Sequence, residues 1–368
     1  MNVPLLDVHK HIETMRPALM AALEQVVGHA RFIMGPEVQQ LEDEIRQYTG
    51  AKHAIACASG TDALLLSIKA LGIGAGDEVI TTPFTFFATA GAVANAGATP
   101  VFVDIKNDTF NIDPDAIEAA ITKETKAIIP VHLFGQSADM GRVMEIAKKH
   151  GLAVIEDAAQ SIGATYKNRM TGTIGDTGCL SFFPSKNLGG IGDGGLVTCN
   201  DDKLAETLIL LRQHGAHQRY YHDIIGTNSR LDTLQAAALL AFLPHLDRWA
   251  KQRAAHAALY TESFSDIPEI ITPACAPDRN HVYNQYTIRV PKRDEFQAYL
   301  TEKQVGCAIY YPVCLHLQKC FAHLGYVEGQ LPLSEQAASQ VISLPVYPEL
   351  SAAQQEYVIS SVRAFFGK

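Results

Sequence analysis

Lys186 is the side chain whose surroundings point most directly to chemistry. It lies in the segment SFFPSKNLGG, among aromatic residues and glycines, with few charges nearby. A lysine that is partly shielded from water has a lowered pKa, and its neutral amine can attack an aldehyde to form a Schiff base. Most lysines are solvated loop residues, so this reactive interpretation depends on the groups that accompany Lys186.

Three other segments carry groups of matching chemistry. Asp157 ends the apolar run LAVIED, where a carboxylate points into the ligand crevice of an open α/β sheet or caps a helix. Residues 59–61, Ser-Gly-Thr, predict a helix start that could hold a phosphate through N–H groups and a hydroxyl, or act only as a cap. Phe86 or Phe87 could stack on a planar ring or fill the core.

Taken together, these signals indicate one cofactor. A phosphate cup, an aromatic ring, a carboxylate and a lysine follow one another along the chain, and pyridoxal 5'-phosphate (PLP) requires all four. The carboxylate would keep the pyridinium nitrogen protonated, so that the ring withdraws electrons, and the lysine would carry the cofactor. The sequence therefore predicts a PLP site.

A sheet must position these groups, and the apolar runs of the chain predict one. They are continuously apolar rather than alternating, and helical patterns separate them, which is typical of a mostly parallel sheet between two layers of helices. One helical pattern begins at Pro36 and ends at Gly50, and another continues from Ser59 to Gly72. The expected strands are residues 53–58, 78–82, 100–104, 127–133, 152–157, 179–183 and 196–200.

The length of 368 residues predicts two domains, because a domain usually has about 150 residues. From about residue 265 the pattern changes to short strands such as 284–290 and helices such as 293–303. We therefore expect a large cofactor-binding domain over residues 1–250 and a smaller α+β domain over residues 251–368.

Composition excludes several classes of function. The formal net charge of −9 disfavours binding to nucleic acid or to an anionic membrane. The seven cysteines include no C-x-x-C pair, so neither a disulfide framework nor a zinc site is indicated, and no other metal motif is present. Reduced thiols and an N-terminus without an apolar signal segment predict a cytoplasmic protein.

Two segments resemble motifs that we reject. Residues 79–103 carry no charge, but Pro83 and Pro100 and the polar residues between them favour strand, helix and strand in a core over a membrane span. Residues 190–195 satisfy G-x-G-x-x-G, yet a strand-like run follows where a dinucleotide site needs a helix. We interpret these glycines as a turn in which the backbone approaches another group closely.

The chain resembles the DegT/DnrJ-type sugar aminotransferases, which belong to the aspartate-aminotransferase superfamily of fold type I. The resemblance runs over essentially the whole chain and implies a large PLP-binding domain followed by a smaller one. It rests on CASGTDAL, PFTFFATAGAV, VHLFGQSADM, VIEDAAQSIGA, SFFPSKNLGGIGDGG and GTNSRLDTLQAA.

The resemblance implies a role for each matching residue. Lys186 would carry the cofactor and exchange protons with the substrate, and Asp157 would pair with the pyridinium nitrogen. The other implied cofactor contacts are Gly60, Thr61 and Ser181 at the phosphate, Phe86 or Phe87 on the ring, Gln160 at the phenolic oxygen, and Asn228 at the phosphate of a neighbouring subunit. The implied substrate contacts are Arg230, Tyr310, Tyr311 and His316. A residue donated by the neighbour implies a homodimer with composite sites.

The implied reaction is amino transfer from L-glutamate to a nucleotide-linked ketosugar. Relatives with histidine in place of the lysine are sugar dehydratases, so Lys186 favours transamination. The run YYHDIIGTNSRLDTLQAA looks most like enzymes that aminate C3 of UDP-2-acetamido-3-oxo sugars, of glucuronate or glucose type, for lipopolysaccharide, lipid A or other surface glycans. A dTDP-3-oxo or dTDP-4-oxo-6-deoxy sugar is the close alternative. A non-catalytic PLP-binding regulator is the alternative from another class.

A basic segment in this acidic chain fits an anionic substrate. Residues 212–230 contain three arginines and three histidines against a single acidic residue, Asp223. Such a segment could clamp a diphosphate or the glutamate carboxylates, or it could be a solvated loop. Its cations are Arg212, Arg219 and Arg230, with His214, His217 and His222.

Overall fold

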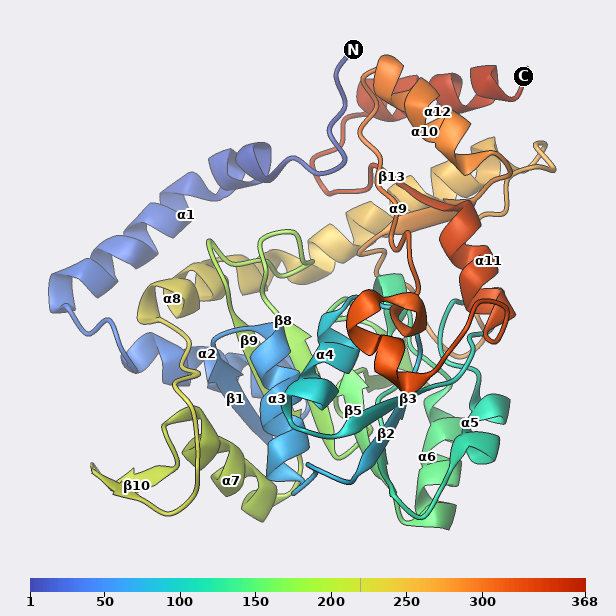
Figure 1. The fold of residues 1–368 in the computed structure, drawn as a ribbon. Helices are drawn as coiled ribbons and strands as arrows, with labels where there is room; N and C mark the ends of the chain where they lie inside the picture. Colours follow the sequence, from blue (N-terminus) through green and yellow to red (C-terminus); the bar gives the residue numbers. More distant parts are fainter. Residues whose placement is uncertain (219) are drawn as a thin grey trace.

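A seven-stranded sheet forms the centre of the protein in the computed structural model, which describes residues 1–218 and 220–368 (Figure 1). The strand order is β1–β9–β8–β5–β4–β2–β3. The strands are β1 (His53–Cys57), β2 (Glu78–Thr81), β3 (Thr99–Phe102), β4 (Thr125–Ile128), β5 (Ala153–Asp157), β8 (Thr177–Ser181) and β9 (Gly195–Cys199).

The sheet is mostly parallel, as the apolar runs predict. Strand β9 runs against its neighbours β1 and β8, whereas the pairs from β8 through β5, β4 and β2 to β3 are parallel. The parallel strands therefore end at one edge of the sheet, and β9 begins there. Ligands bind at this edge in open α/β sheets, because the loops that follow the strands meet there.

Helices cover both faces of the sheet, which confirms the predicted layers. Helices α3 (Gly60–Ala70), α4 (Ala88–Asn95) and α7 (Asp202–Arg212) pack on one face. On the other face lie α2 (Pro36–Thr49), α5 (Pro114–Ala120), α6 (Met140–His150) and α8 (Thr233–Phe242), with α1 (Val8–His29) running along α8.

Alternation along β5 decides which way its last two residues point. Ile155 packs in the cluster under α3 and α4, whereas Val154 packs in the cluster under α5 and α6. Successive side chains of a strand point to opposite faces. Asp157 is therefore directed towards α4 and Glu156 towards α6.

A second hydrophobic core forms around the C-terminal part of the chain. It joins the long helix α9 (Leu246–Ser263), α10 (Arg293–Glu302), α12 (Ala352–Phe365) and the antiparallel pair β12 (Tyr286–Arg289) and β13 (Val341–Leu344). Val3 enters this core and bridges to Val305, so the first residues of the chain lie among its last elements (Figure 1). The division at residue 250 stays a prediction.

The remaining elements are short or peripheral. Helix α11 (Pro332–Gln340) precedes β13 directly. The small antiparallel pairs are β6 (Thr165–Tyr166) with β7 (Arg169–Met170), and β10 (Ala216–Gln218) with β11 (Tyr221–His222).

Two sequence predictions can be compared directly with these elements. Residues 79–103 form β2, α4 and β3, as predicted, and none of the helices that the structure describes is long and apolar enough to cross a membrane. The predicted strand 127–133 is wrong at its end, because β4 stops at Ile128. Pro130 has no N–H to donate to the ladder, and beyond it only the single bridge between Val131 and Asp157 remains.

The prediction of an anion clamp in residues 212–230 is wrong for the first arginine of that segment. Arg212 is buried, and its guanidinium donates to the carboxylate of Glu42 and to the carbonyl of Ala56. It therefore ties α7 to α2 and β1, and its predicted part in an anion clamp is wrong. Arg219 lies outside the described residues.

Candidate active site

A cavity of about 600 Å³ opens at the edge where the parallel strands end. This volume suits a small-molecule site, which usually measures about 300–1,000 Å³. The lining residues come from the ends of β1, β2, β4, β5 and β8 and the segments that follow them, from the segment before β9, and from the C-terminal part of the chain. They are Ser59, Gly60, Thr61, Leu64, Thr85, Phe86, Ala88, Val131, Asp157, Ala159, Gln160, Ser181, Phe183, Ser185, Lys186, Asp193, Gly194, Gln285, Tyr310 and Tyr311.

Lys186 and Asp157 lie in this cavity as charges of opposite sign. Burial lowers the pKa of the Lys186 ammonium, and the neighbouring carboxylate of Asp157 opposes that shift. In the described part of the chain Lys186 makes no ion pair within 4.0 Å, so its amine is not held by a permanent partner. This is the environment in which a lysine amine becomes a nucleophile and a base.

Two hydrogen bonds hold the carboxylate of Asp157, which is the last residue of β5. Its Oδ2 accepts from Thr89 Oγ1 at 2.7 Å, and its Oδ1 accepts from the backbone N–H of Ala159 at 3.2 Å. Burial raises the pKa of the carboxyl, and both hydrogen bonds and the charge of Lys186 act against that shift. Thr89 is a contact that the sequence does not predict, although Thr85 and Thr89 are spaced one helical turn apart in PFTFFATAG.

Residues 59–61, where a phosphate cup is predicted, lie at the start of α3. Ser59 Oγ accepts from the N–H of Asp62 at 3.1 Å, so the predicted cap is present as well. A Cβ on Gly60 would lie 2.7 Å from the Cβ of Ser181, which shows how closely the two backbones approach. Thr61 and Ser181 line the cavity, where N–H groups at a helix start together with two hydroxyls are suited to hold an anion.

The two adjacent phenylalanines have different surroundings. Phe86 lines the cavity and is 57% exposed, so its ring is free to stack on a planar group. Phe87 instead packs against Phe321, with the ring centroids 5.8 Å apart, and against the backbone of Gly91. The structure therefore places Phe86, and not Phe87, at the cavity.

Gln160 and the tyrosine pair Tyr310 and Tyr311 form another part of the cavity wall. Gln160 Oε1 accepts from the N–H of Phe134 at 2.6 Å, and its Nε2 donates to Tyr311 Oη at 3.1 Å. These bonds fix which end of the amide faces Tyr311. Tyr310 and Tyr311 both line the cavity, and burial raises the pKa of each hydroxyl, so both stay protonated and can donate.

Three predicted site residues do not line the cavity of their own chain. Asn228 is exposed, and its Oδ1 accepts from Arg230 Nε at 2.9 Å. His316 is buried, and its Nε2 lies 3.1 Å from Glu335 Oε1. Burial behind that contact keeps His316 from reaching a substrate in the cavity as the described chain is arranged.

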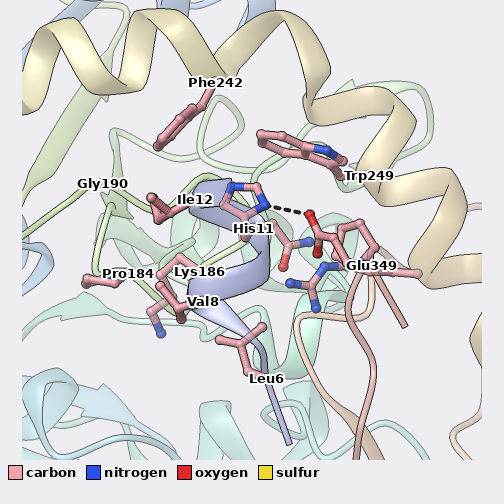
Figure 2. Close-up of a pocket in the computed structure, with 14 residues that line it drawn as sticks. Leu6, Val8, His11, Ile12, Pro184, Lys186, Gly190, Phe242, Trp249 and Glu349 are labelled. Atoms are coloured by element: carbon pink, nitrogen blue, oxygen red, sulfur yellow. Dashed lines mark hydrogen bonds and ion pairs between the residues drawn. The ribbon is translucent and has the colours of Figure 1, made fainter. Parts of the chain in front are cut away.

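A second cavity also touches Lys186, but it is too small for a cofactor. Its volume is about 30 Å³, room for only one or two water molecules. Figure 2 shows His11 pointing at Glu349 across this space, and His11 Nδ1 lies 2.8 Å from Glu349 Oε1. The larger cavity is therefore the candidate active site.

The larger cavity fits PLP by the chemistry of its side chains. The cup at Gly60 and Ser181 suits a phosphate, Phe86 suits an aromatic ring, Asp157 suits a protonated ring nitrogen, and Lys186 suits an aldehyde.

Comparisons with known proteins agree with this fit. The family model described as the DegT/DnrJ/EryC1/StrS aminotransferase family matches residues 13–363. A pleiotropic regulatory protein of Geobacillus stearothermophilus is 54% identical, covering 100% of this chain and 99% of that protein. A UDP-N-acetyl-3-dehydro-alpha-D-glucosamine 3-aminotransferase of Acidithiobacillus ferrooxidans is 44% identical, covering 98% of this chain and 97% of that enzyme.

Two further matches complete the comparison. A dTDP-3-amino-3,4,6-trideoxy-alpha-D-glucose transaminase of Streptomyces venezuelae is 43% identical, covering 98% of this chain and 96% of that enzyme. The crystal structure of DesV from S. venezuelae superposes with a TM-score of 0.98 at 43% identity, covering 100% of this chain and 99% of that one.

The close approach at Gly60 gives a test of the phosphate cup. Gly60→Ala should weaken PLP binding to the apoprotein at least about tenfold, because the new methyl group must push α3 away from Ser181. Calorimetric titration with PLP measures this change. Gly28→Ala is the matched control, since a Cβ there meets nothing within 4 Å. Equal affinities of the two variants would contradict the cup.

Proposed function

Because the chain belongs to the DegT/DnrJ/EryC1/StrS aminotransferase family and is a PLP-dependent sugar aminotransferase, we propose that it aminates C3 of a UDP-linked 2-acetamido-3-oxo sugar. L-Glutamate is the proposed amino donor, and lipopolysaccharide, lipid A or another surface glycan is the proposed destination of the product. The observation that carries the proposal is the cavity in which Lys186 and Asp157 face one another beside the phosphate cup.

When bound, PLP supplies an electron-withdrawing ring that makes the C–H bond beside the transferred nitrogen acidic. Lys186 Nζ is proposed to remove that proton and return it to the carbon on the other side of the nitrogen, which requires the neutral amine that burial favours. Asp157 is proposed to hold a proton on the ring nitrogen through its ionised carboxylate. The position of both side chains in the cavity supports these proposed roles.

The other lining residues are proposed to bind and orient. The cup at Gly60, Thr61 and Ser181 would hold the phosphate, and Phe86 would lie against the ring. Gln160 would contact the phenolic oxygen from the strand end beside Asp157. Tyr310 and Tyr311 would donate hydrogen bonds from their hydroxyl groups to the sugar. Gln160 donates to Tyr311 Oη and so fixes its position.

The identity of the nucleotide is the finer part of the proposal. The UDP-sugar relative is 44% identical and the dTDP-sugar relative is 43% identical, so overall likeness does not separate them. The UDP sugar is supported by the run YYHDIIGTNSRLDTLQAA, and a dTDP-3-oxo or 4-oxo-6-deoxy sugar is the second candidate. Direct comparison of the two substrates decides between them.

A regulatory function is the second class to consider, since the relative at 54% identity is named a pleiotropic regulatory protein. The candidate site carries the lysine, the carboxylate and the hydroxyl groups of a working transaminase. We therefore propose catalysis, whether or not the protein also has a regulatory part. Turnover is the property that a sensor without catalysis would lack.

A homodimer is proposed because, among the described residues, Lys186 is the single cation that lines the cavity of one chain. The charged side chains that line it within the described residues are Asp157, Lys186 and Asp193. A cofactor phosphate and a nucleotide diphosphate require more cations than one lysine supplies. Exposed Asn228 and half-buried Arg230, which line no part of their own cavity, are proposed to complete the site of a partner copy.

The substrate proposal predicts a preference measurable in one assay. With L-glutamate as donor, UDP-2-acetamido-3-oxo-glucose or its glucuronate should react with kcat/KM at least about tenfold above that of dTDP-3-oxo and dTDP-4-oxo sugars. The unstable ketosugars are generated in situ by their dehydrogenases or dehydratases. Turnover confined to dTDP sugars would contradict the UDP assignment, and absence of turnover with every ketosugar would favour the regulator.

The composite site predicts an unusual pattern of complementation. A co-expressed heterodimer of Lys186→Ala with Asn228→Ala, purified through two different tags, should have about half of the wild-type activity, because one of its two sites is intact. Either homodimer alone should be nearly inactive. The matched control pairs wild type with the Lys186→Ala/Asn228→Ala double variant and should be inactive. The reverse pattern would show that Asn228 acts within its own chain.

A further inference from the structure

Two threonines connect the rim of the cavity to the carboxylate of Asp157. Thr89 is fully buried in the first turn of α4, and its Oγ1 donates to Asp157 Oδ2 at 2.7 Å. Thr85 lies four residues earlier, lines the cavity, and has its Oγ1 3.1 Å from Thr89 Oγ1. The three groups therefore form a continuous hydrogen-bonded row.

The direction of this row follows from counting protons. An ionised carboxylate only accepts hydrogen bonds, and a hydroxyl has a single proton to donate. Because Thr89 gives its proton to Asp157, it must accept the proton of Thr85. Both hydroxyl dipoles then point at the carboxylate, and each bond strengthens the other.

Four other threonines in the helices of this protein bond differently from Thr89. Thr14, Thr49, Thr207 and Thr301 each donate to the backbone carbonyl four residues earlier. This local bond is the usual choice of a threonine inside a helix. Thr89 forgoes it and donates across 68 residues of sequence to Asp157. Local helix geometry therefore does not account for its hydrogen bond.

The surroundings of Asp157 explain why such a donor matters. Lys186 faces it with a charge that favours its ionised form, His132, Tyr311 and Cys179 lie close enough to interact with it, and Glu156 adjoins it along β5. Burial is nonetheless the largest effect on its pKa and acts towards the neutral acid. Thr89 is the foremost of the effects that act against burial.

We propose that Thr89 is a positioning residue that keeps Asp157 ionised and aimed into the cavity, and that Thr85 supports it by donating to Thr89. The inference rests on the proposed role of Asp157 at the ring nitrogen of PLP. The hydrogen bond from Thr89 turns Oδ2 of Asp157 towards α4, and the hydrogen bond from Ala159 holds Oδ1 against the backbone. The carboxylate therefore has a fixed orientation. A protonated Asp157 could not hold a proton on the ring nitrogen.

The test is the pH dependence of PLP binding to the apoprotein, which involves no sugar. Protonation of Asp157 should weaken PLP binding as pH falls. Thr89→Val keeps the shape of the side chain but removes the donor, so the carboxyl pKa rises and the midpoint of this loss should move to higher pH by about one to two units. Thr89→Ser keeps the donor and should restore the wild-type midpoint. Thr85→Val should move the midpoint in the same direction by less.

The outcomes separate this inference from the proposed function. An unmoved midpoint in Thr89→Val, with affinity lowered equally at every pH, would overturn it. Should Thr89→Val fail to fold, Thr85→Val carries the test, and an unmoved midpoint there would overturn it equally. Asp157→Asn should abolish the titration. If the titration persists in Asp157→Asn, the cofactor role of Asp157 is wrong and the inference fails with it, whereas the choice of sugar has no effect on any of these results.

Discussion

The site depends on the electrostatic interaction between two side chains of opposite charge, Lys186 and Asp157. Burial drives both towards their neutral forms, and each is partly held in its charged form by the other. The sheet imposes this arrangement: Asp157 pairs in register with Cys179 of β8, and the chain reaches Lys186 seven residues later. A lysine with no fixed ion pair beside a carboxylate held by hydrogen bonds is suited to move protons while the carboxylate stays still.

Strand β9 explains how the phosphate cup joins this pair. Gly195 pairs with Cys57 on one side and with Ser181 on the other, so the ends of β1 and β8 lie either side of the start of β9. The helix start after β1 is thereby brought against Ser181, with no room for a side chain at Gly60. The antiparallel strand in a mostly parallel sheet thus brings the cup within reach of the residues that follow β8.

Much of this arrangement follows from sequence, because apolar runs and caps are local signals. The strands, the cap at Ser59 and the cavity positions of Lys186 and Asp157 were predictable for that reason. Contacts between distant segments were not. In the sequence Arg212 belongs to a basic cluster, and only the structure shows its buried partner Glu42, 170 residues away. Thr89 likewise looks like an ordinary helical residue, and only the structure shows its hydrogen bond to Asp157. Strand β4 ends before Pro130, and the continuous apolar run of residues 127–133 gave no sign of this end.

The claim that Lys186 is the reactive amine can be tested most directly by borohydride reduction of the PLP-loaded protein, followed by mapping of the labelled peptide. The account predicts a single cofactor label, on Lys186, and loss of labelling after L-glutamate has been added, since the donor would then have released the lysine. Lys203→Ala, which alters an exposed lysine of α7, should label as the wild type does. A reducible link that persists in Lys186→Ala, or a label on another lysine, would contradict the account.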